Sequence, residues 1–482
     1  MRAIFFVILC VALYLPARAD VRLPKIFTDH MVLQQQLPIR IWGHADAGEA
    51  VAVDFAGEHG ETVADSSGHW RVELPAMNAD GKPHSLTVKG KNSIELKDVM
   101  LGEVWLAVGQ SNMSRGLRYV KQRAMAERMD FADYRLFFVG LDQVPQMEEA
   151  ASTKGWAPAT HESMEKIFVH PTLGPYEYSE VAYEFGNHLR EKLDVPVGMI
   201  AVAYGGTTAS QWTPAENPAG RFDFASGKPD KGPGSMYQSM LVGIPPLSIR
   251  GVVYYQGEND AANAHYGTDL LKMLEAWRKN FERPDLPFYM AQMAQTTFQG
   301  GMLHVTQAQC WLTKNAPDTA IAPSNDLWDD ADPQKAKTRL DKETGWPITG
   351  GRDPHPPNKN IIAIRLANIA LAKTYGKVSG EVLGPTVASG QTVGDALRVK
   401  FDHVGKGLKT DDGDAPNWFQ IAGDDKKFVK AQAKIIGNDT VELRSPDVKA
   451  PRYFRFAWNP LARHNLYNSE GLPALNYGSS RD

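Results

Sequence analysis

The most informative short segment of this chain is an apolar run that ends at a serine. Residues 104–108 (VWLAV) are followed directly by residues 109–113 (GQSNM). A short apolar run closed by glycine is typical of a buried strand that enters a tight turn. The turn presents the hydroxyl of Ser111 beyond the carboxyl end of the strand, where open α/β sheets bind their ligands. Ser111 is therefore a candidate nucleophile, although a serine in this place can also simply cap the next helix.

Two later apolar strands are predicted to end in residues that suit an oxyanion site. One runs into Gly205 and Gly206, and two glycines let backbone N–H groups come close to a ligand. Another runs into Gln256, Glu258 and Asn259, which place two amides and a carboxylate within four residues. Either amide could donate to an oxyanion, but glycine, asparagine and aspartate also occur in turns that have no chemical role.

A histidine suited to act as a base precedes the last predicted helix of this part of the chain. His355 lies two residues after Asp353, and Pro354 and Pro356 on either side hold it in a stiff, extended segment. A carboxylate can fix the imidazole tautomer while the other ring nitrogen accepts the proton of a serine. Asp353 is the expected partner of His355, and Asp326 is the reserve candidate.

The polar clusters fit one arrangement of elements, in which strands alternate with helices from about residue 101 to 376. This alternation predicts a parallel sheet that is covered by helices on both faces. The expected strands span 104–108, 197–204, 251–255, 288–293 and 319–323, and the expected helices cover 181–193, 270–281 and 361–371. Residues 20–100 and 377–482 predict short alternating strands with Gly, Asp and Pro turns, and so two flanking β regions.

Four segments resemble the four blocks of the SGNH-type carbohydrate esterases, and in particular the group similar to sialate O-acetylesterases. They are Gly109-Gln110-Ser111-Asn112-Met113, Gly205-Gly206-Thr207, Gln256-Gly257-Glu258 and His355-Pro356. Further matches outside these blocks include His30-Met31-Val32-Leu33-Gln34 and Asn465-Leu466-Tyr467-Asn468. The resemblance implies an α/β fold with an SGNH-type, flavodoxin-like parallel sheet covered by helices and flanked by N- and C-terminal β-sandwich-like regions.

The same resemblance implies roles for the site residues. Ser111 is the expected nucleophile and His355 the base, with oxyanion donors from Ser111, the Gly205-Gly206 turn and the third block. Within the third block we favour Gln256 over Asn259. The chain departs from the family pattern at its last block, where the aspartate stands two residues before the histidine instead of three.

The function predicted from the sequence is a carbohydrate O-acetylesterase that works through a Ser-His-Asp acyl-enzyme. Trp212, Trp346 and Glu258 are the expected substrate-binding residues, and Trp328 could also stack on a sugar ring. The substrate is an acetylated sialate or a hemicellulose such as xylan or xyloglucan. The tryptophans and the absence of an evident carboxylate clamp favour a neutral plant-type saccharide over sialate, although Arg115 and Arg118 could still meet an anionic sugar. No cofactor or metal is expected, because the His and Cys spacings match no zinc site.

Two alternatives belong to other functional classes. One is a non-catalytic carbohydrate-binding protein on a relic hydrolase core, which the complete set of Ser111, Asp353 and His355 argues against. The other is a peptidase that uses the same three residues, which the family resemblance disfavours.

The N-terminus and the composition indicate an exported protein. Residues 1–19 combine Arg2, an apolar stretch and an Ala17-Arg18-Ala19 cleavage site, which is the pattern of a secretory signal peptide. Removal of this segment leaves Cys310 as the only cysteine, so no disulfide can form within the mature chain. We expect a secreted or periplasmic location. The formal net charge of −4 shows no preference for nucleic acid, and no membrane span is expected; the oligomeric state is not indicated.

Overall fold

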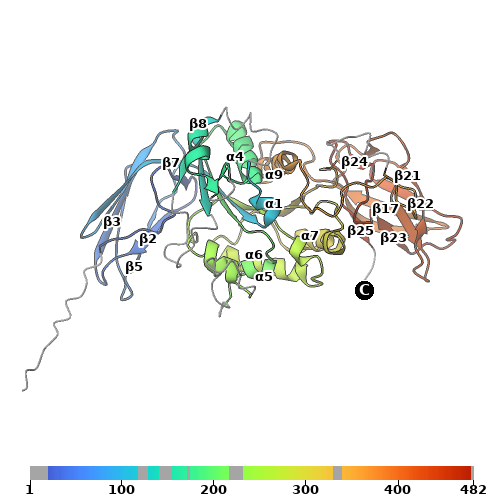
Figure 1. Cartoon of the computed structure of the whole chain (residues 1–482), viewed down its shortest axis with the longest axis horizontal. Coiled ribbons are helices and arrows are strands. Elements are labelled where there is room, and N and C mark those ends of the chain that lie inside the picture. Colours follow the sequence, from blue (N-terminus) through green and yellow to red (C-terminus); the bar gives the residue numbers. More distant parts are fainter. Residues whose placement is uncertain are drawn as a thin grey trace, which may run out of the picture.

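Strand β7 (Ser93–Gly109) connects two parts of the molecule, because it runs from the N-terminal β region into the centre of the α/β domain. The computed structural model describes residues 20–117, 129–139, 155–170, 174–215, 232–328 and 339–478. The predicted signal peptide and Arg118 lie outside these residues. Figure 1 shows the N-terminal strands, the central domain and the C-terminal strands side by side along the long axis. The domain boundary predicted at residue 100 falls inside β7 and stays a prediction.

The N-terminal region consists of short strands whose side chains alternate between core and solvent. In β5 the residues Trp70, Val72 and Leu74 are buried, while the three residues that alternate with them are exposed, as expected for a strand with one face on a core. Strand β6 pairs with the first half of β7, and β1 pairs in parallel with residues 100–102 of the same strand. The strands are β1 (Val32–Gln34), β2 (Ile39–His44), β3 (Ala50–Phe55), β4 (Glu58–Val63), β5 (His69–Leu74) and β6 (His84–Lys89).

The central sheet contains all five strands predicted from the sequence. Its order is β15-β14-β13-β7-β12-β8-β9, and every neighbouring pair is parallel except β8 with β9. Every residue of β12, β13, β14 and β15 is buried, as expected for a sheet covered on both faces. The remaining bounds are β8 (Asp130–Val139), β9 (Ala157–Thr160), β12 (Val197–Ala203), β13 (Gly251–Tyr255), β14 (Phe288–Ala291) and β15 (Thr319–Ala322).

Helices cover the two faces of this sheet in pairs. Helix α4 packs against α9 on one face, and α6 packs against α7 on the other (Figure 1). The sequence predicts α4, α6 and α9, whereas α7 and strand β8 were not predicted. The long helices are α4 (Glu180–Leu193), α6 (Tyr266–Asn280), α7 (Leu303–Asn315) and α9 (Lys359–Lys373). Shorter elements are α1 (Ser111–Ser114), α3 (His161–Lys166), β10 (Val169–His170), β11 (Gly174–Pro175), α5 (Ala209–Trp212), η4 (Tyr237–Leu241), η5 (Glu258–Asp260) and η6 (Phe298–Gly300).

The C-terminal region has a hydrophobic core of its own. Two four-stranded sheets, β16-β17-β22-β21 and β20-β19-β23-β25, contribute buried side chains to that core, and Phe401 of the first sheet contacts Phe456 of the second. The strands are β16 (Thr386–Val393), β17 (Ala396–Asp402), β18 (Leu408–Thr410), β19 (Phe419–Ala422), β20 (Val429–Lys430), β21 (Gln432–Ile436), β22 (Thr440–Arg444), β23 (Tyr453–Phe456), β24 (Leu466–Asn468) and β25 (Tyr477–Gly478). The N-terminal strands, in contrast, share one continuous core with the central domain.

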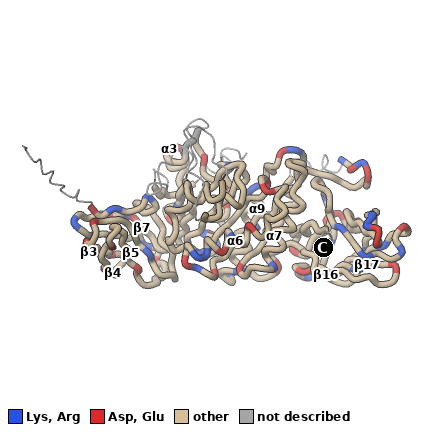
Figure 2. Tube along the Cα trace, turned by 90° about the horizontal axis from the view of Figure 1, so that it is seen from below, with Lys and Arg blue, Asp and Glu red and all other residues tan. Residues whose placement is uncertain are grey.

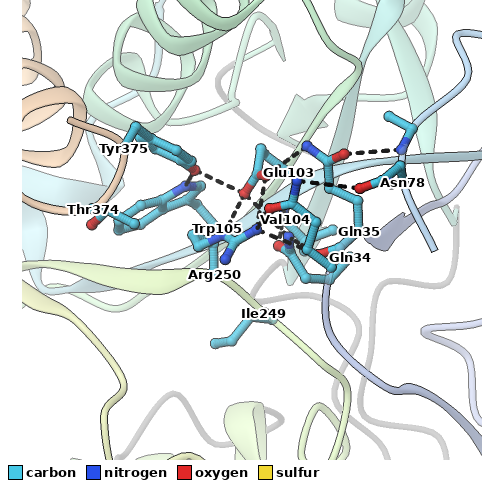
Figure 3. Close-up of polar contacts among 12 residues, drawn as sticks. Gln34, Gln35, Asn78, Glu103, Val104, Trp105, Ile249, Arg250, Thr374 and Tyr375 are labelled. Atoms are coloured by element: carbon cyan, nitrogen blue, oxygen red, sulfur yellow. Dashed lines mark hydrogen bonds and ion pairs between the residues drawn. The ribbon is translucent and has the colours of Figure 1, made fainter. Parts of the chain in front are cut away.

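A buried carboxylate joins the N-terminal region to the central domain. Glu103 lies in β7, where its side chain accepts hydrogen bonds from Gln34 and Gln35 of the N-terminal region (Figure 3). It also accepts hydrogen bonds from Arg250 and Tyr375 of the central domain. The two parts are therefore connected by a shared polar cluster as well as by a shared strand.

Charged residues of both signs are mixed over the surface of all three regions (Figure 2). Among the described residues, no helix is both long enough and apolar enough to cross a membrane.

Candidate active site

Ser111 begins helix α1 directly beyond the carboxyl end of β7. The turn requires glycine at position 109, because a Cβ atom there would lie 2.2 Å from the carbonyl oxygen of Tyr255 in β13. That oxygen instead accepts a 3.1 Å hydrogen bond from the backbone N–H of Gln110. Ser111 is partly exposed, whereas Asn112 and Met113 are buried beneath it. The sequence thus folds so that this one hydroxyl faces outward.

The structure brings Ser111, His355 and Asp353 into contact in that order. The Oγ atom of Ser111 lies 2.9 Å from Nε2 of His355, although 244 positions separate the two residues. On the other side of the ring, Nδ1 of His355 lies 2.6 Å from Oδ1 of Asp353. The same carboxylate oxygen accepts a 3.0 Å hydrogen bond from the backbone N–H of His355, which fixes the short segment between them.

The protonation state of His355 follows from these contacts. An ionised carboxylate only accepts hydrogen bonds, so Nδ1 carries the proton and Nε2 is left to accept from Ser111. Burial of Asp353 acts to raise its pKa, but the hydrogen bonds from His355 outweigh burial and leave the pKa lowered. Burial also lowers the pKa of His355, against the opposing effect of Asp353, and the positive charges of Arg115 and Lys359 lower it further. The imidazole is therefore neutral at pH 7, as a general base requires.

The glycine turn after β12 lies beside the serine. A Cβ atom on Gly205 would lie 3.5 Å from the Cβ atom of Ser111, so the backbone of the turn is in van der Waals reach of the site. Gly206 has a φ of +75°, a left-handed conformation that favours glycine. Both glycines are exposed. Their N–H groups are thus available close to the hydroxyl of Ser111.

Gln256, the amide favoured from the sequence, is directed into the protein. Its side chain is fully buried, and its Nε2 atom donates to the carbonyl oxygen of Thr207 at 2.8 Å and to Asp260 at 2.7 Å. Its Oε1 atom accepts a 2.9 Å hydrogen bond from the hydroxyl of Tyr254. An amide group has only two N–H donors, and both of these are used by protein acceptors. This geometry does not favour Gln256 as a donor to a substrate.

Asn259 fits that role better. It lies in η5 and is partly exposed, and its Oδ1 atom accepts a hydrogen bond from Gln299 at 3.3 Å. Its Nδ2 atom has no hydrogen-bond partner among the described residues. Its backbone N–H donates to Oε1 of Gln110 at 3.4 Å, which holds η5 next to the turn that carries Ser111.

The three residues predicted to bind substrate are all buried, which does not favour them as contacts for a sugar, and their role stays a prediction. Trp212 is completely buried and donates its indole N–H to Thr207. Trp346 is 8% exposed and packs against Trp418 in the C-terminal core. Glu258 is 2% exposed, and one of its oxygens accepts a hydrogen bond from Asn112. The residue type alone gave no indication that these side chains turn inward.

Trp328 is the remaining tryptophan that the sequence placed near the site, and it is partly exposed. Its Nε1 atom would lie 3.3 Å from a Cβ atom on Gly350, five residues before His355. The reserve acid Asp326 has a different partner, because both of its oxygens accept hydrogen bonds from Arg365 in α9 at 2.7 and 2.6 Å. It therefore anchors this helix, while Asp353 contacts His355.

The sequence reasoning missed a buried polar cluster under Ser111 that contains Asn112, Glu258 and Lys359. One signal for it was available. Lys359 stands at the start of helix α9, where the helix dipole disfavours a cation. Among the described residues, no group of three or more His, Cys, Asp or Glu side chains is placed to hold a metal ion.

Comparison with known proteins identifies the family of the chain. Residues 101–345 match the model of a family described as carbohydrate esterases, sialic acid-specific acetylesterases. The chain belongs to this family. It is 26% identical over 414 residues to the sialate O-acetylesterases of Pongo abelii and of Homo sapiens, an alignment that covers 76% of this chain and 73% of each relative. The crystal structure of a carbohydrate acetylesterase from Xanthomonas citri superposes with a TM-score of 0.79 at 28% identity, covering 96% of this chain and all of that one.

Proposed function

We propose that this carbohydrate esterase removes acetyl groups from sugar hydroxyls, with Ser111 as nucleophile, His355 as base and Asp353 as the acid that orients the base. The observation that carries the proposal is the continuous contact from Ser111 Oγ to His355 Nε2 at 2.9 Å and from His355 Nδ1 to Asp353 at 2.6 Å. A nucleophile next to a base that is itself oriented by a third group is the arrangement that activates a weakly acidic hydroxyl.

The first half of the reaction forms the acetyl-enzyme. Ser111 Oγ attacks the acetyl carbonyl carbon while His355 Nε2 takes the hydroxyl proton. The negative charge on the former carbonyl oxygen is stabilised by N–H donors from Ser111, Gly206 and the side-chain amide of Asn259. When the tetrahedral intermediate collapses, the bond to the sugar oxygen breaks, and the proton from His355 passes to that oxygen.

The second half regenerates the enzyme. A water molecule attacks the acetyl carbonyl while His355 takes one of its protons. The bond to Ser111 Oγ then breaks, the proton returns to Oγ, and acetate leaves. Because His355 is neutral at the start of each half-reaction, its lowered pKa suits both steps.

Two residues near the proposed catalytic group favour different sugars. The positive charge of Arg115 lies close enough to affect the pKa values of both His355 and Asp353, and a guanidinium suits the carboxylate of an acetylated sialic acid. Trp328 is partly exposed, although its indole nitrogen is buried, and its side chain suits stacking on a neutral pyranose of xylan or xyloglucan. The burial of Trp212 and Trp346 removes two of the three tryptophans on which the neutral-sugar interpretation depends.

The decisive experiment measures acetate release from O-acetylated sialosides, acetylated xylan, acetylated xyloglucan and acetylated pectin. We expect release from at least one of them by the wild-type protein, and loss of that release in Ser111→Ala. Loss of sialoside activity in Arg115→Ala would assign the anionic sugar, and loss of xylan or xyloglucan activity in Trp328→Ala would assign the neutral one. Binding of these sugars without any acetate release would support the non-catalytic alternative instead.

A further inference from the structure

Three polar side chains that take no part in the proposed acyl transfer are buried directly beneath Ser111. Asn112, Glu258 and Lys359 are 1%, 2% and 2% exposed, and they come from α1, η5 and α9 respectively. Polar groups are buried in a protein only at a cost in free energy, unless they are well paired. Their contacts therefore need a specific explanation.

Asn112 and Lys359 form a bridge between the serine and histidine segments. Nδ2 of Asn112 donates a 3.0 Å hydrogen bond to the carbonyl oxygen of Pro354, and Oδ1 of Asn112 accepts a 2.5 Å hydrogen bond from Nζ of Lys359. Nζ of Lys359 also donates to the carbonyl oxygen of Pro356 at 3.3 Å. Pro354 and Pro356 are the residues on either side of His355. The bridge thus holds the backbone on both sides of the imidazole and connects it to the residue that follows Ser111.

The buried charges of this cluster are costly, and the negative charges of Glu180 and Glu258 only partly offset the cost of burying Lys359. Burial lowers the pKa of Lys359 to about 8, against the opposing charges of Glu180 and Glu258, so the side chain is still mainly an ammonium group at neutral pH. Burial raises the pKa of Glu258, and its Oε2 atom has no hydrogen-bond partner among the described residues. A cation in the first turn of α9 also opposes the helix dipole. Helix stability therefore does not explain why a lysine lies at this position.

We propose that Asn112 and Lys359 are positioning residues, which set the distance between His355 and Ser111 by holding the Pro354 and Pro356 carbonyls to the serine turn. The inference rests on the proposed roles of Ser111 and His355. The direct contact between those two residues is a single hydrogen bond, and it must break and re-form in every cycle. The bridge keeps the two segments in place while the proton moves. A displacement of about 1 Å at such a contact can reduce a rate by about 100-fold.

The test compares Asn112→Leu, Lys359→Met and the double variant with the wild type on a chromogenic acetyl ester. Leucine and methionine keep most of the volume of the native side chains but cannot form the bridge. We expect each single variant to lower kcat by about 10- to 100-fold with little change in KM, because the nucleophile and base are present but less well placed. The double variant should be slower than either single variant, but by less than the product of the two single losses, because the two residues share the contact between Lys359 Nζ and Asn112 Oδ1.

Arg365→Met is the matched control. It also removes a cation from α9, and with it the ion pair to Asp326, but it leaves the bridge intact. We expect this variant to keep the wild-type kcat even if its melting temperature falls. Melting temperatures of all variants separate lost stability from lost positioning. If Lys359→Met does not fold, Asn112→Leu alone tests the bridge, and Lys359→Gln, which removes the charge but can still donate to Asn112, serves for the pH profile.

The pH profile provides a readout that a purely structural role would not change. Among the described residues, the charges with the largest effects on the pKa of His355 are those of Asp353 in its own segment, Arg115 after α1 and Lys359 on α9. Asp353 raises this pKa and the other two lower it. Loss of the Lys359 charge should therefore move the acid limb of kcat/KM to higher pH. Asn112→Leu changes no charge and should leave the position of the limb unchanged.

The outcomes separate this inference from the proposed function. A folded Asn112→Leu or Lys359→Met variant with wild-type kcat would overturn the inference, and so would a change in KM alone or fully additive losses in the double variant. None of these results would affect the assignment of Ser111. Activity that persists in Ser111→Ala would instead contradict the proposed function itself.

Discussion

Two buried glutamate clusters lie along strand β7. One surrounds Glu103 within the strand, and the other surrounds Glu258 beyond the carboxyl end of the strand. The two clusters differ in how many hydrogen bonds the glutamate accepts. Glu103 accepts five hydrogen bonds, from Gln34 at 3.1 Å, Gln35 at 2.8 Å, Arg250 at 2.7 and 3.0 Å and Tyr375 at 2.8 Å (Figure 3). Glu258, under the serine turn, accepts a hydrogen bond from Asn112 on one oxygen, while the other oxygen has no partner among the described residues.

The difference indicates what each cluster does. Both carboxylate oxygens of Glu103 are saturated, and its partners come from the N-terminal region as well as from the central domain, so this cluster connects two parts of the fold. The cluster around Glu258 is less completely paired and adjoins the proposed catalytic residues. Incompletely paired buried polar groups are costly, and such groups are concentrated at functional sites. Changes at the Glu103 cluster should therefore affect stability, and changes near Ser111 should affect turnover.

The largest expected effect is the loss of the base. His355→Ala should lower kcat by about four to six orders of magnitude, and the double variant with Ser111→Ala should be little worse, because the two residues act as a unit. Steady-state rates on a chromogenic acetyl ester measure this. The melting temperature should stay close to that of the wild type, and a variant that keeps a tenth of the wild-type rate would refute the assignment.

The next effect distinguishes the two candidate acids. Asp353→Asn should reduce kcat by about four orders of magnitude, because an amide at this position favours the wrong imidazole tautomer. Asp326→Asn removes the negative partner of the ion pair with Arg365. It should keep nearly full activity but have a lower melting temperature. The opposite ranking of the two kcat values would make Asp326 the orienting acid.

A change at the Glu103 cluster should lower the stability of the protein and leave turnover unchanged. Arg250→Met leaves the Glu103 carboxylate buried without its cation and should cost about 3 kcal/mol of unfolding free energy, as is typical when one partner of a buried pair is removed. Urea unfolding followed by circular dichroism measures this, and kcat of the folded fraction should be unchanged. Lys89→Met, which breaks an exposed pair with Asp54, is the control and should hardly affect the unfolding curve.

A smaller effect on turnover should identify the oxyanion amide. Asn259→Ala should lower kcat by about two to three orders of magnitude with little effect on KM. Gln256→Ala removes a fully buried side chain that donates to Thr207 and Asp260, so it should mainly lower the melting temperature. If Gln256→Ala proved the slower of the two while remaining stable, the amide favoured by the sequence would be the right one.

The smallest expected effect is a shift in pH dependence. Burial lowers the pKa of His355 from its ordinary value of 6.5, so the acid limb of kcat/KM should have its midpoint below that value. Arg115 lowers the same pKa, and Arg115→Gln should therefore move the limb to higher pH. An unchanged or lower midpoint in this variant would show that the guanidinium does not act on the imidazole.

Local sequence was sufficient wherever a few neighbouring residues determine the structure. Continuous apolar runs predicted five of the seven strands in the order of the central sheet, and the spacing of apolar residues predicted α4, α6 and α9. Asp353 can contact His355 because only one residue separates them, and that contact was predicted. Strand β8 was missed because the charged residues Asp130, Asp133 and Arg135 interrupt its apolar residues and leave a short continuous apolar run only at its end.

The tertiary structure alone decided which way the side chains point. The sequence could predict that Ser111, Gly205, Gln256 and His355 lie near one edge of the sheet, because parallel strands end on the same side. It could not show that Gln256, Trp212 and Glu258 turn inward while Asn259 stays accessible, since burial depends on elements far away in the chain. For the same reason the pairing of Asp326 with Arg365, and the bridge from Lys359 through Asn112 to the histidine segment, became visible only in the folded molecule.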